Sequence, residues 1–482
     1  MKTLQNIFVH VLLLSSIMAA TAQTGWNNGG GNAGRNGYAA TAGPLTDSVL
    51  WQVNTPGFFG SPLFIEGDKL VTMRFRSPTD APVECYNLFN GSLLWSADVT
   101  GSTGRSLPVG FRDQKVYVVH YTDNMNDSLF ALDANTGNRL WAANLTVAPY
   151  ITSTAVFDSA GYLYIEGNQK MYKIDPQNGQ QIWQTPSIPM ASGSGEMAIN
   201  NSTGRGYTLE NIGGVSYVWT INLATGAKLY NRAVPDLQPG GNVPQSALMV
   251  GGNGIIYVQL TEDNIAALSD NGTQLSLLWQ TKIQGNCPFS LMCTGSDGSV
   301  YVPSNGKVLR LDPLAGTILD SSQSITQGGF YILRASATDN GLIYVTNGED
   351  YVYAFGLNLN LVWSDYVPVT NTSGVCIAPN GLIAVSGSQV VKVYTPNPST
   401  STESATAVLA SISPNPATSF VRLDTKKDMS GKQVIIIDAT GRSVFQQKLS
   451  GFSSTIDISE LPAGIYWLVI EGATTGSRLI KK

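Results

Sequence analysis

Residues able to carry nucleophilic or metal chemistry are scarce in this chain of 482 residues. It contains two histidines, His10 and His120. A Ser-His-Asp triad or a histidine-rich metal site needs histidine, and His10 lies in an N-terminal apolar run, so His120 alone is left for either. Its neighbours Val118, Val119 and Tyr121 are typical of an ordinary strand. We therefore predict no catalytic residue and no metal ligand.

The four cysteines allow one disulfide. Cys287 and Cys293 are close enough in sequence to staple a loop in an exported chain. Cys85 and Cys376 stand alone in apolar surroundings and are expected to be small buried residues. No Cys-x-x-Cys-His sequence occurs, which excludes a covalently attached c-type haem.

A hairpin ending in tryptophan recurs along the chain and is its strongest signal. In the clearest copy a strand ends at Leu132, Asp133 caps the turn, and Thr136 and Gly137 reverse the chain before Trp141. Gly137 is expected to take a positive φ, which glycine adopts at little cost. Equivalent turn residues are Asp175, Gly179 and Gly226. Positions equivalent to Trp141 fall 41 to 49 residues apart, at Trp51, Trp95, Trp183, Tyr230, Trp279, Asp320 and Trp363.

These repeats predict an all-β fold, an eight-bladed β-propeller. A second hairpin with a glycine turn precedes several of the tryptophan hairpins, so each repeat supplies the four strands of one blade. The last repeat, 374–396, has three strands and no tryptophan, whereas residues 48–53 carry Trp51 ahead of any complete repeat. Strand 48–53 is therefore expected to complete the last blade and close the ring, which removes an open sheet edge. A ring of seven blades, with 48–53 packed elsewhere, is the alternative.

Residues 131–141 match the quinoprotein-type (PQQ-like) repeat Ala-x-Asp-x-x-Thr-Gly-x-x-x-Trp. The resemblance extends over about residues 26–396, including a glycine-rich lead-in. It implies that the repeat tryptophans dock between blades; Tyr230 and Asp320 depart from the pattern. Enzymes of this family are dehydrogenases that hold pyrroloquinoline quinone with Ca²⁺, and other members are non-catalytic scaffolds.

Both ends of the chain are typical of an exported protein. Lys2, an apolar run and the small residues up to Ala22 indicate a signal peptide, 1–22, cleaved before Gln23. A lead-in, 23–47, precedes the propeller, 48–396. A Ser/Thr-rich linker, 397–406, then leads to a second all-β pattern, 407–482, which suits a small β-sandwich.

The C-terminal pattern resembles the type A sorting domain of type IX secretion (Por) substrates in Bacteroidetes. The residues that carry this resemblance are Pro414, Asn415, Pro416, Gly441, Gly464 and Tyr466. The resemblance implies recognition by the type IX secretion machinery and a secreted or outer-membrane-surface location.

Charge narrows the choice of partners. Residues 23–406 carry 18 Lys/Arg against 27 Asp/Glu, a poor match for nucleic acid. We therefore expect a monomeric binding or scaffold protein for a protein or glycan ligand, with no cofactor and no transmembrane segment in the mature chain. A PQQ- or metal-dependent oxidoreductase and a surface adhesin with a purely structural ring are the alternatives.

Overall fold

The computed structural model describes most of the chain after its N-terminal segment. It covers residues 25–54, 58–59, 63–77, 80–99, 105–121, 128–143, 145, 154–167, 170–187, 197–212, 215–234, 247–260, 264–283, 292–325, 334–368, 374–396, 410–425, 428–438, 442–470 and 477–482. The predicted signal peptide, with Ala22 and Gln23, and the linker 397–406 lie outside these ranges. In the described ranges, no helix is long and apolar enough to cross a membrane.

Within the described residues, the chain up to Tyr394 forms eight antiparallel sheets, numbered here in chain order. Their strands are: sheet 1, β5 (Phe64–Glu66), β6 (Lys69–Phe75), β7 (Val83–Asn87), β8 (Leu93–Ala97); sheet 2, β9 (Arg105–Arg112), β10 (Lys115–Tyr121), β11 (Leu129–Asp133), β12 (Arg139–Ala143); sheet 3, β13 (Val156–Phe157), β14 (Leu163–Gly167), β15 (Lys170–Ile174), β16 (Gln181–Gln184); sheet 4, β17 (Ala198–Asn200), β18 (Arg205–Ile212), β19 (Val215–Asn222), β20 (Lys228–Ala233); sheet 5, β21 (Ala247–Val250), β22 (Ile256–Leu260), β23 (Asn264–Asp270), β24 (Leu275–Lys282); sheet 6, β25 (Cys293–Thr294), β26 (Val300–Ser304), β27 (Lys307–Leu311), β28 (Ile318–Ser321); sheet 7, β29 (Arg334–Thr338), β30 (Leu342–Thr346), β31 (Tyr351–Gly356), β32 (Leu361–Tyr366); sheet 8, β33 (Cys376–Ile377), β34 (Ile383–Ser386), β35 (Val390–Tyr394) and β3 (Val49–Asn54). Three short strands join them: β1 (Gly25–Trp26) beside β5, β2 (Tyr38–Ala39) beside β29, and β4 (Phe58–Phe59) beside β6.

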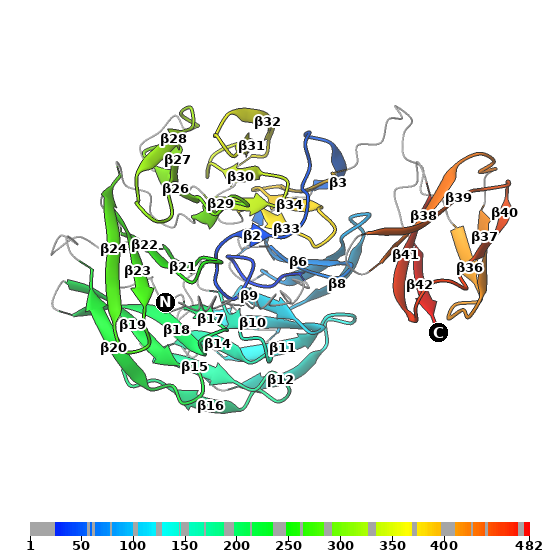
Figure 1. Cartoon of the computed structure of the whole chain (residues 1–482). Helices are drawn as coiled ribbons and strands as arrows, with labels where there is room; N and C mark the ends of the chain where they lie inside the picture. The colour runs from blue at the N-terminus through cyan, green and yellow to red at the C-terminus, as the bar shows by residue number, and fades with distance from the viewer. Residues whose placement is uncertain are drawn as a thin grey trace, which may run out of the picture.

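The sheets surround a common centre, in the manner of a propeller (Figure 1). The first strand of one sheet contacts the first strand of the next, as β13 does β17 and β29 does β33. The burial pattern follows from this arrangement. In sheet 7, every residue of β30 is buried, whereas β32 is largely exposed apart from Trp363. Strands packed on both faces therefore have continuous runs of buried residues, whereas an outer strand such as β32 is mostly exposed around one buried aromatic ring.

The N-terminal strand β3 supplies the outer strand of sheet 8. It pairs antiparallel with β35, and Trp51 lies opposite Val393. The inner strand β33 in turn contacts β5 of sheet 1, so sheet 8 adjoins sheet 1. This is the pairing that the sequence led us to expect for residues 48–53.

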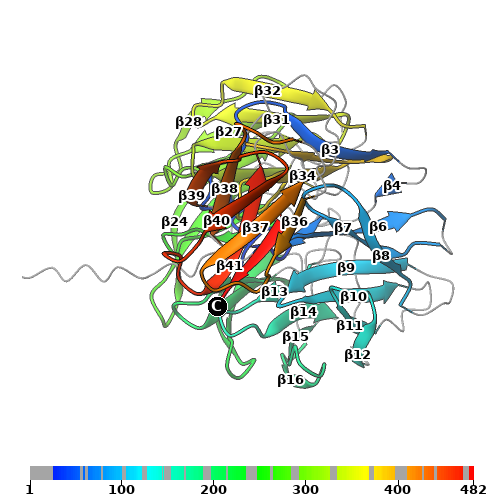
Figure 2. The ribbon, with the colours of Figure 1, turned by 90° about the vertical axis from the view of Figure 1, so that its right-hand side faces the viewer.

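The C-terminal residues form two further sheets around a core of their own (Figure 2). One contains β36 (Ala410–Ser413), β37 (Phe420–Thr425) and β40 (Ser453–Asp457). The other contains β39 (Ser443–Lys448), β38 (Gln433–Asp438), β41 (Gly464–Ile470) and β42 (Ser477–Lys481). Val421 and Ile456 of the first sheet share one buried cluster with Ile436 and Leu468 of the second.

One sequence expectation is corrected. Cys293 is buried with a free thiol, so the disulfide that its spacing from Cys287 allowed is not formed; Cys287 itself lies outside the described residues. Cys293 belongs to inner strand β25, where its side chain packs in the apolar core between sheets 6 and 7. Cys85 and Cys376 are buried free thiols, as expected.

Candidate functional site

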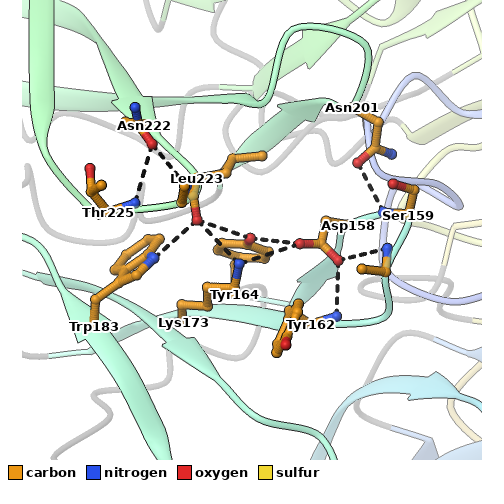
Figure 3. Close-up of polar contacts among 12 residues, drawn as sticks. Asp158, Ser159, Tyr162, Tyr164, Lys173, Trp183, Asn201, Asn222, Leu223 and Thr225 are labelled. Carbon is orange, nitrogen blue, oxygen red and sulfur yellow. Dashed lines mark hydrogen bonds and ion pairs between the residues drawn. The ribbon is translucent and has the colours of Figure 1, made fainter.

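A tryptophan latch joins sheets 3 and 4 (Figure 3). The indole N–H of Trp183 donates a 3.0 Å hydrogen bond to the carbonyl oxygen of Leu223 in the next sheet. The ring lies flat against Gly226 of the same turn, where a Cβ would come within 2.6 Å of it. Gly226 has a φ of +74°. A buried ring and a satisfied indole N–H together fix the two sheets at this seam.

A buried polar network surrounds this latch. Asp158 accepts hydrogen bonds from the hydroxyl of Tyr164 at 2.7 Å and from the backbone N–H of Tyr162. Lys173 pairs with Asp158 at 3.7 Å and donates to the Leu223 carbonyl at 3.2 Å. Burial, and then the hydrogen bond to Asp158, raises the pKa of Tyr164, so its phenol stays protonated. Each polar group has a structural partner, and the network holds the seam together.

The same latch recurs around the ring. Each indole N–H but the last donates to a carbonyl in a turn of the following sheet, and its ring lies against the glycine of that turn; the last, that of Trp363, donates to Pro44 in the segment that precedes β3. The pairs are Trp51 with Leu88 and Gly91, Trp95 with Ala134 and Gly137, Trp141 with Pro176 and Gly179, Trp279 with Pro313 and Gly316, and Trp363 with Pro44. Asp133 holds the repeat turn by accepting from the N–H of Asn135 and from the N–H and hydroxyl of Thr136. Asp175 does the same for Gln177.

Two seams lack the tryptophan. Between sheets 4 and 5 the hydroxyl of Tyr230 donates a 2.6 Å hydrogen bond to the carboxylate of Asp270 in the next sheet. Between sheets 6 and 7 Asp320 pairs with Arg310 of its own sheet at 2.9 Å. One bond that crosses this second seam runs from the Tyr301 hydroxyl to the Leu357 carbonyl, at 2.8 Å.

A strap, residues 25–44, crosses the centre of the ring (blue in Figure 1). It meets the eight sheets in order. Its contacts are Trp26 with Ile65, Asn27 with Phe111, Gly29 with Thr154, Ala33 with Ile199, Gly34 with Val250, Asn36 with Thr294, Gly37 with Ala337, and Ala42 with Gly381. Most of these are backbone hydrogen bonds, so the strap joins the inner strands to one another.

The glycine content of the strap follows from how closely it approaches the ring. A Cβ on Gly34 would lie 2.6 Å from the carbonyl oxygen of Val250, too near for any other residue type. Arg35, which is 3% exposed, anchors the strap by donating to the Thr154 hydroxyl at 2.8 Å. The strap was expected only as a lead-in; its glycines were the sequence signal that it packs against the inner strands.

The strap forms one wall of a pocket of about 420 Å³, called here the amide pocket. The other walls are the turns that follow β17 and β21. The described lining is Asn32, Ala33, Gly34, Asn36, Ile199, Asn200, Asn201, Ser202, Val250, Gly251, Gly252, Asn253 and Gly254. None of these residues carries a charge. Asn36 is fixed by its bond to the Val250 carbonyl, and Asn200 by bonds from Ser202, which leaves the Asn200 amide nitrogen directed toward Gly254.

The amide pocket does not fit pyrroloquinoline quinone with Ca²⁺. Calcium takes six to eight oxygen ligands, usually including carboxylates, and this lining supplies none. The oxygens of Asn36 and Asn253 already accept bonds from the N–H groups of Tyr38 and Ile255. Elsewhere in the described part of the chain, no cluster of three metal-ligating side chains occurs, and His120 is 5% exposed.

The remaining predicted residues lie apart from this site. In the C-terminal sheets, Asn415 accepts from the N–H of Ile480, and Tyr466 donates to the Pro462 carbonyl. Gly464 begins β41, next to the edge strand β42. Pro414 and Pro416 flank Asn415, and Gly441 lies outside the described residues. Phe58 and Phe59 form the short strand β4, which pairs with β6.

Comparisons with known proteins agree with this architecture. Residues 35–210 match the family model described as outer membrane protein assembly factor BamB, and residues 411–482 match the secretion system C-terminal sorting domain. BamB of Moranella endobia (strain PCIT) is 24% identical over 325 residues, which is 61% of this chain and 77% of that protein.

Two of the solved structures that are similar in fold illustrate the range of functions. BamB from Moraxella catarrhalis gives a TM-score of 0.56 at 15% identity, over 72% of this chain and 99% of that one. Quinohemoprotein alcohol dehydrogenase from Comamonas testosteroni gives 0.58 at 12% identity, over 80% and 83%. Because an enzyme and an assembly factor share this fold, the likeness establishes architecture and leaves activity open.

Both resemblances seen in the sequence are thereby confirmed. The chain combines a BamB-like repeat domain, whose structural neighbours are quinoprotein β-propellers, with a secretion sorting domain at its C-terminus. The sorting domain indicates export by the type IX secretion system to the cell surface or the extracellular space.

Proposed function

We propose that this exported chain is an eight-bladed β-propeller that binds a neutral glycan in the amide pocket. The eight sheets are its blades, and the two C-terminal sheets form a β-sandwich that the secretion machinery recognises. Export to the surface supports a binding role, because a ring of loops and turns on a rigid scaffold presents ligand sites there.

The observation that carries the proposal is the chemistry of the pocket. Asparagine amides offer both hydrogen-bond donors and acceptors, as sugar hydroxyls do. The absence of charge among the described lining residues favours a neutral ligand over an ionic one. At about 420 Å³ the pocket falls within the range of about 300 to 1,000 Å³ that is typical of small-ligand sites.

Gly252 gives a clean test. It lines the pocket, is exposed, has no positive φ, and a Cβ added there meets nothing within 4 Å. Gly252→Phe therefore obstructs the pocket without straining the fold. Ser296 occupies the equivalent position in the turn after β25, which has the same hydrogen bonds, so Ser296→Phe is the matched control.

The measurement is a screen of neutral glycans against the mature chain, followed by titration calorimetry on those retained. We expect Gly252→Phe to weaken binding at least about tenfold, and Ser296→Phe to leave it unchanged. Retention of no glycan, or equal affinity in all three proteins, would refute the proposal. Stabilisation of the chain by pyrroloquinoline quinone with Ca²⁺ would favour the oxidoreductase instead.

A further inference from the structure

Two exposed tyrosines meet on sheet 7. Among the described tyrosines, Tyr351 and Tyr366 are the ones exposed by more than a third, at 40% and 53%. They lie opposite each other in β31 and β32. Their ring centroids are 5.6 Å apart and the planes are nearly perpendicular, at 79°. The two rings therefore form a corner open to solvent, called here the tyrosine corner.

The corner is supported from below by a column of rings. Tyr353 lies 5.8 Å from Tyr351, and Phe355 is stacked on Tyr353 at 5.9 Å. Phe355 is fully buried in the core between sheets 6 and 7. Because Tyr353 packs on the buried ring of Phe355, its position is fixed. Tyr353 in turn forms the floor of the corner. Rings held in this way bind a ligand without a large loss of side-chain entropy.

Two acidic residues precede the corner in the chain. Glu349 and Asp350 immediately precede Tyr351. Asn347 holds this loop, because its side-chain amide oxygen accepts from the backbone N–H groups of both Glu349 and Tyr351 at 3.1 Å. Burial, and then the nearby Tyr351 and Glu349, raises the pKa of Tyr353, so Glu349 lies close enough to act on this ring. The ring as a whole is acidic as well, with 18 Lys/Arg against 27 Asp/Glu in residues 23–406.

We propose that the tyrosine corner binds an alkylammonium group. A cation is attracted to the face of an aromatic ring, most strongly where several rings surround it, and neighbouring carboxylates add to the attraction. The corner offers two partly exposed rings at nearly a right angle, and Glu349 and Asp350 precede Tyr351 in the chain. This site lies on sheet 7, away from the residues of the amide pocket, and it does not depend on glycan binding there.

The test separates charge from shape. Choline and its uncharged isostere 3,3-dimethylbutan-1-ol have the same size, so only a site that recognises charge distinguishes them. We expect choline to shift the ring resonances of Tyr351, Tyr353 and Tyr366 in ¹³C-labelled mature chain. The isostere is expected to leave these resonances in place. Titration with N-acetyl-lysine methylamide asks whether a peptide side chain or a choline headgroup is the better source of the cation.

Exposed Tyr366 supplies the matched variants. Tyr366→Leu removes one ring and is expected to weaken cation binding about tenfold, while Tyr366→Phe keeps the ring and the affinity. Glu349→Gln removes one negative charge and is also expected to weaken cation binding. The loss of affinity should be larger at low salt, where mobile ions screen the charge of Glu349 less. Equal shifts by choline and the isostere, or shifts by methyl glucoside but by neither cation, would overturn the proposal. So would the absence of any shift.

Discussion

The seam between sheets 3 and 4 and the seam between sheets 6 and 7 solve one packing problem in different ways. At the first, Trp183 is 8% exposed, lies on Gly226 and donates to the Leu223 carbonyl. At the second, Asp320 stands at the tryptophan position and pairs within its own sheet. Leu359, on the facing turn, fills the seam: it has a φ of +60° and is 4% exposed.

The difference shows which feature of the repeat stabilises the ring. Where the turn carries glycine, a tryptophan from the preceding sheet can lie against it. Where the turn carries Leu359, the leucine side chain fills the space that a tryptophan ring occupies at the tryptophan seams. The residue at the tryptophan position, Asp320, can therefore be polar. Tryptophan and glycine are thus two halves of one contact, and they are lost together at the seam between sheets 6 and 7. We expect the tryptophan seams to carry most of the stability between sheets.

Trp183→Ala should give the largest loss. It removes a buried ring and leaves the Lys173 and Tyr164 groups around the Leu223 carbonyl without their packing partner. A cost of about 3 to 5 kcal/mol is expected in denaturant unfolding followed by circular dichroism. Asp320→Ala is the control, with a cost below about 1 kcal/mol because its ion pair is partly exposed. Comparable losses for the two variants would show that the seams do not differ.

Gly226→Ala tests the other half of the contact. Its Cβ would sit 2.6 Å from the Trp183 ring and its φ is +74°, so steric overlap adds to backbone strain. Gly204 has a similar φ of +65° but nothing within 4 Å, so Gly204→Ala reports the strain alone, about 1 kcal/mol. Thermal unfolding should place Gly226→Ala about 1 to 2 kcal/mol below Gly204→Ala. If the two variants unfold together, the ring and the glycine are not packed as described.

The seam between sheets 4 and 5 should respond to acid. Burial raises the pKa of Asp270, but bonds from Tyr230, the Gly272 N–H and Tyr207, with Arg205 nearby, outweigh it and lower the pKa below 3.8. The stabilisation is present above pH 3.8 and is lost as pH falls through the folded-state value. Asp270→Asn should therefore cost about 1 kcal/mol at pH 7 and less near pH 2, measured by urea unfolding at both. A cost that does not change with pH would contradict this account.

The repeat was predictable because its information is local. Asp133, Gly137 and Trp141 fall within one hairpin, and turn chemistry fixes their conformations. The pairing of Trp51 with Val393 was also expected, because one strand was missing at the end and one was spare at the beginning. The sequence did not reveal that, at the seam between sheets 7 and 8, the Pro44 carbonyl of the strap is the acceptor for Trp363.

The candidate sites were less predictable, since both depend on distant segments. Asn36 meets Val250 across 214 residues, and no local pattern specifies that contact. The glycines around Gly34 were the available signal, because close backbone approach demands them. Tyr351 and Tyr366 belong to ordinary strand patterns, and only the register of β31 against β32 brings their rings together. Cys293 is the opposite case. Its spacing from Cys287 suggested a disulfide, but Cys293 lies in the inner strand β25 as a buried free thiol.

Hydrogen–deuterium exchange of the mature chain, with and without the bound glycan, tests most directly that strap and turns together make the binding site. Ligand should slow exchange in the strap around 32–37 and in the turns 200–204 and 251–254, and should change nothing in Gly252→Phe. Protection confined to other segments, with the strap unaffected, would contradict the account.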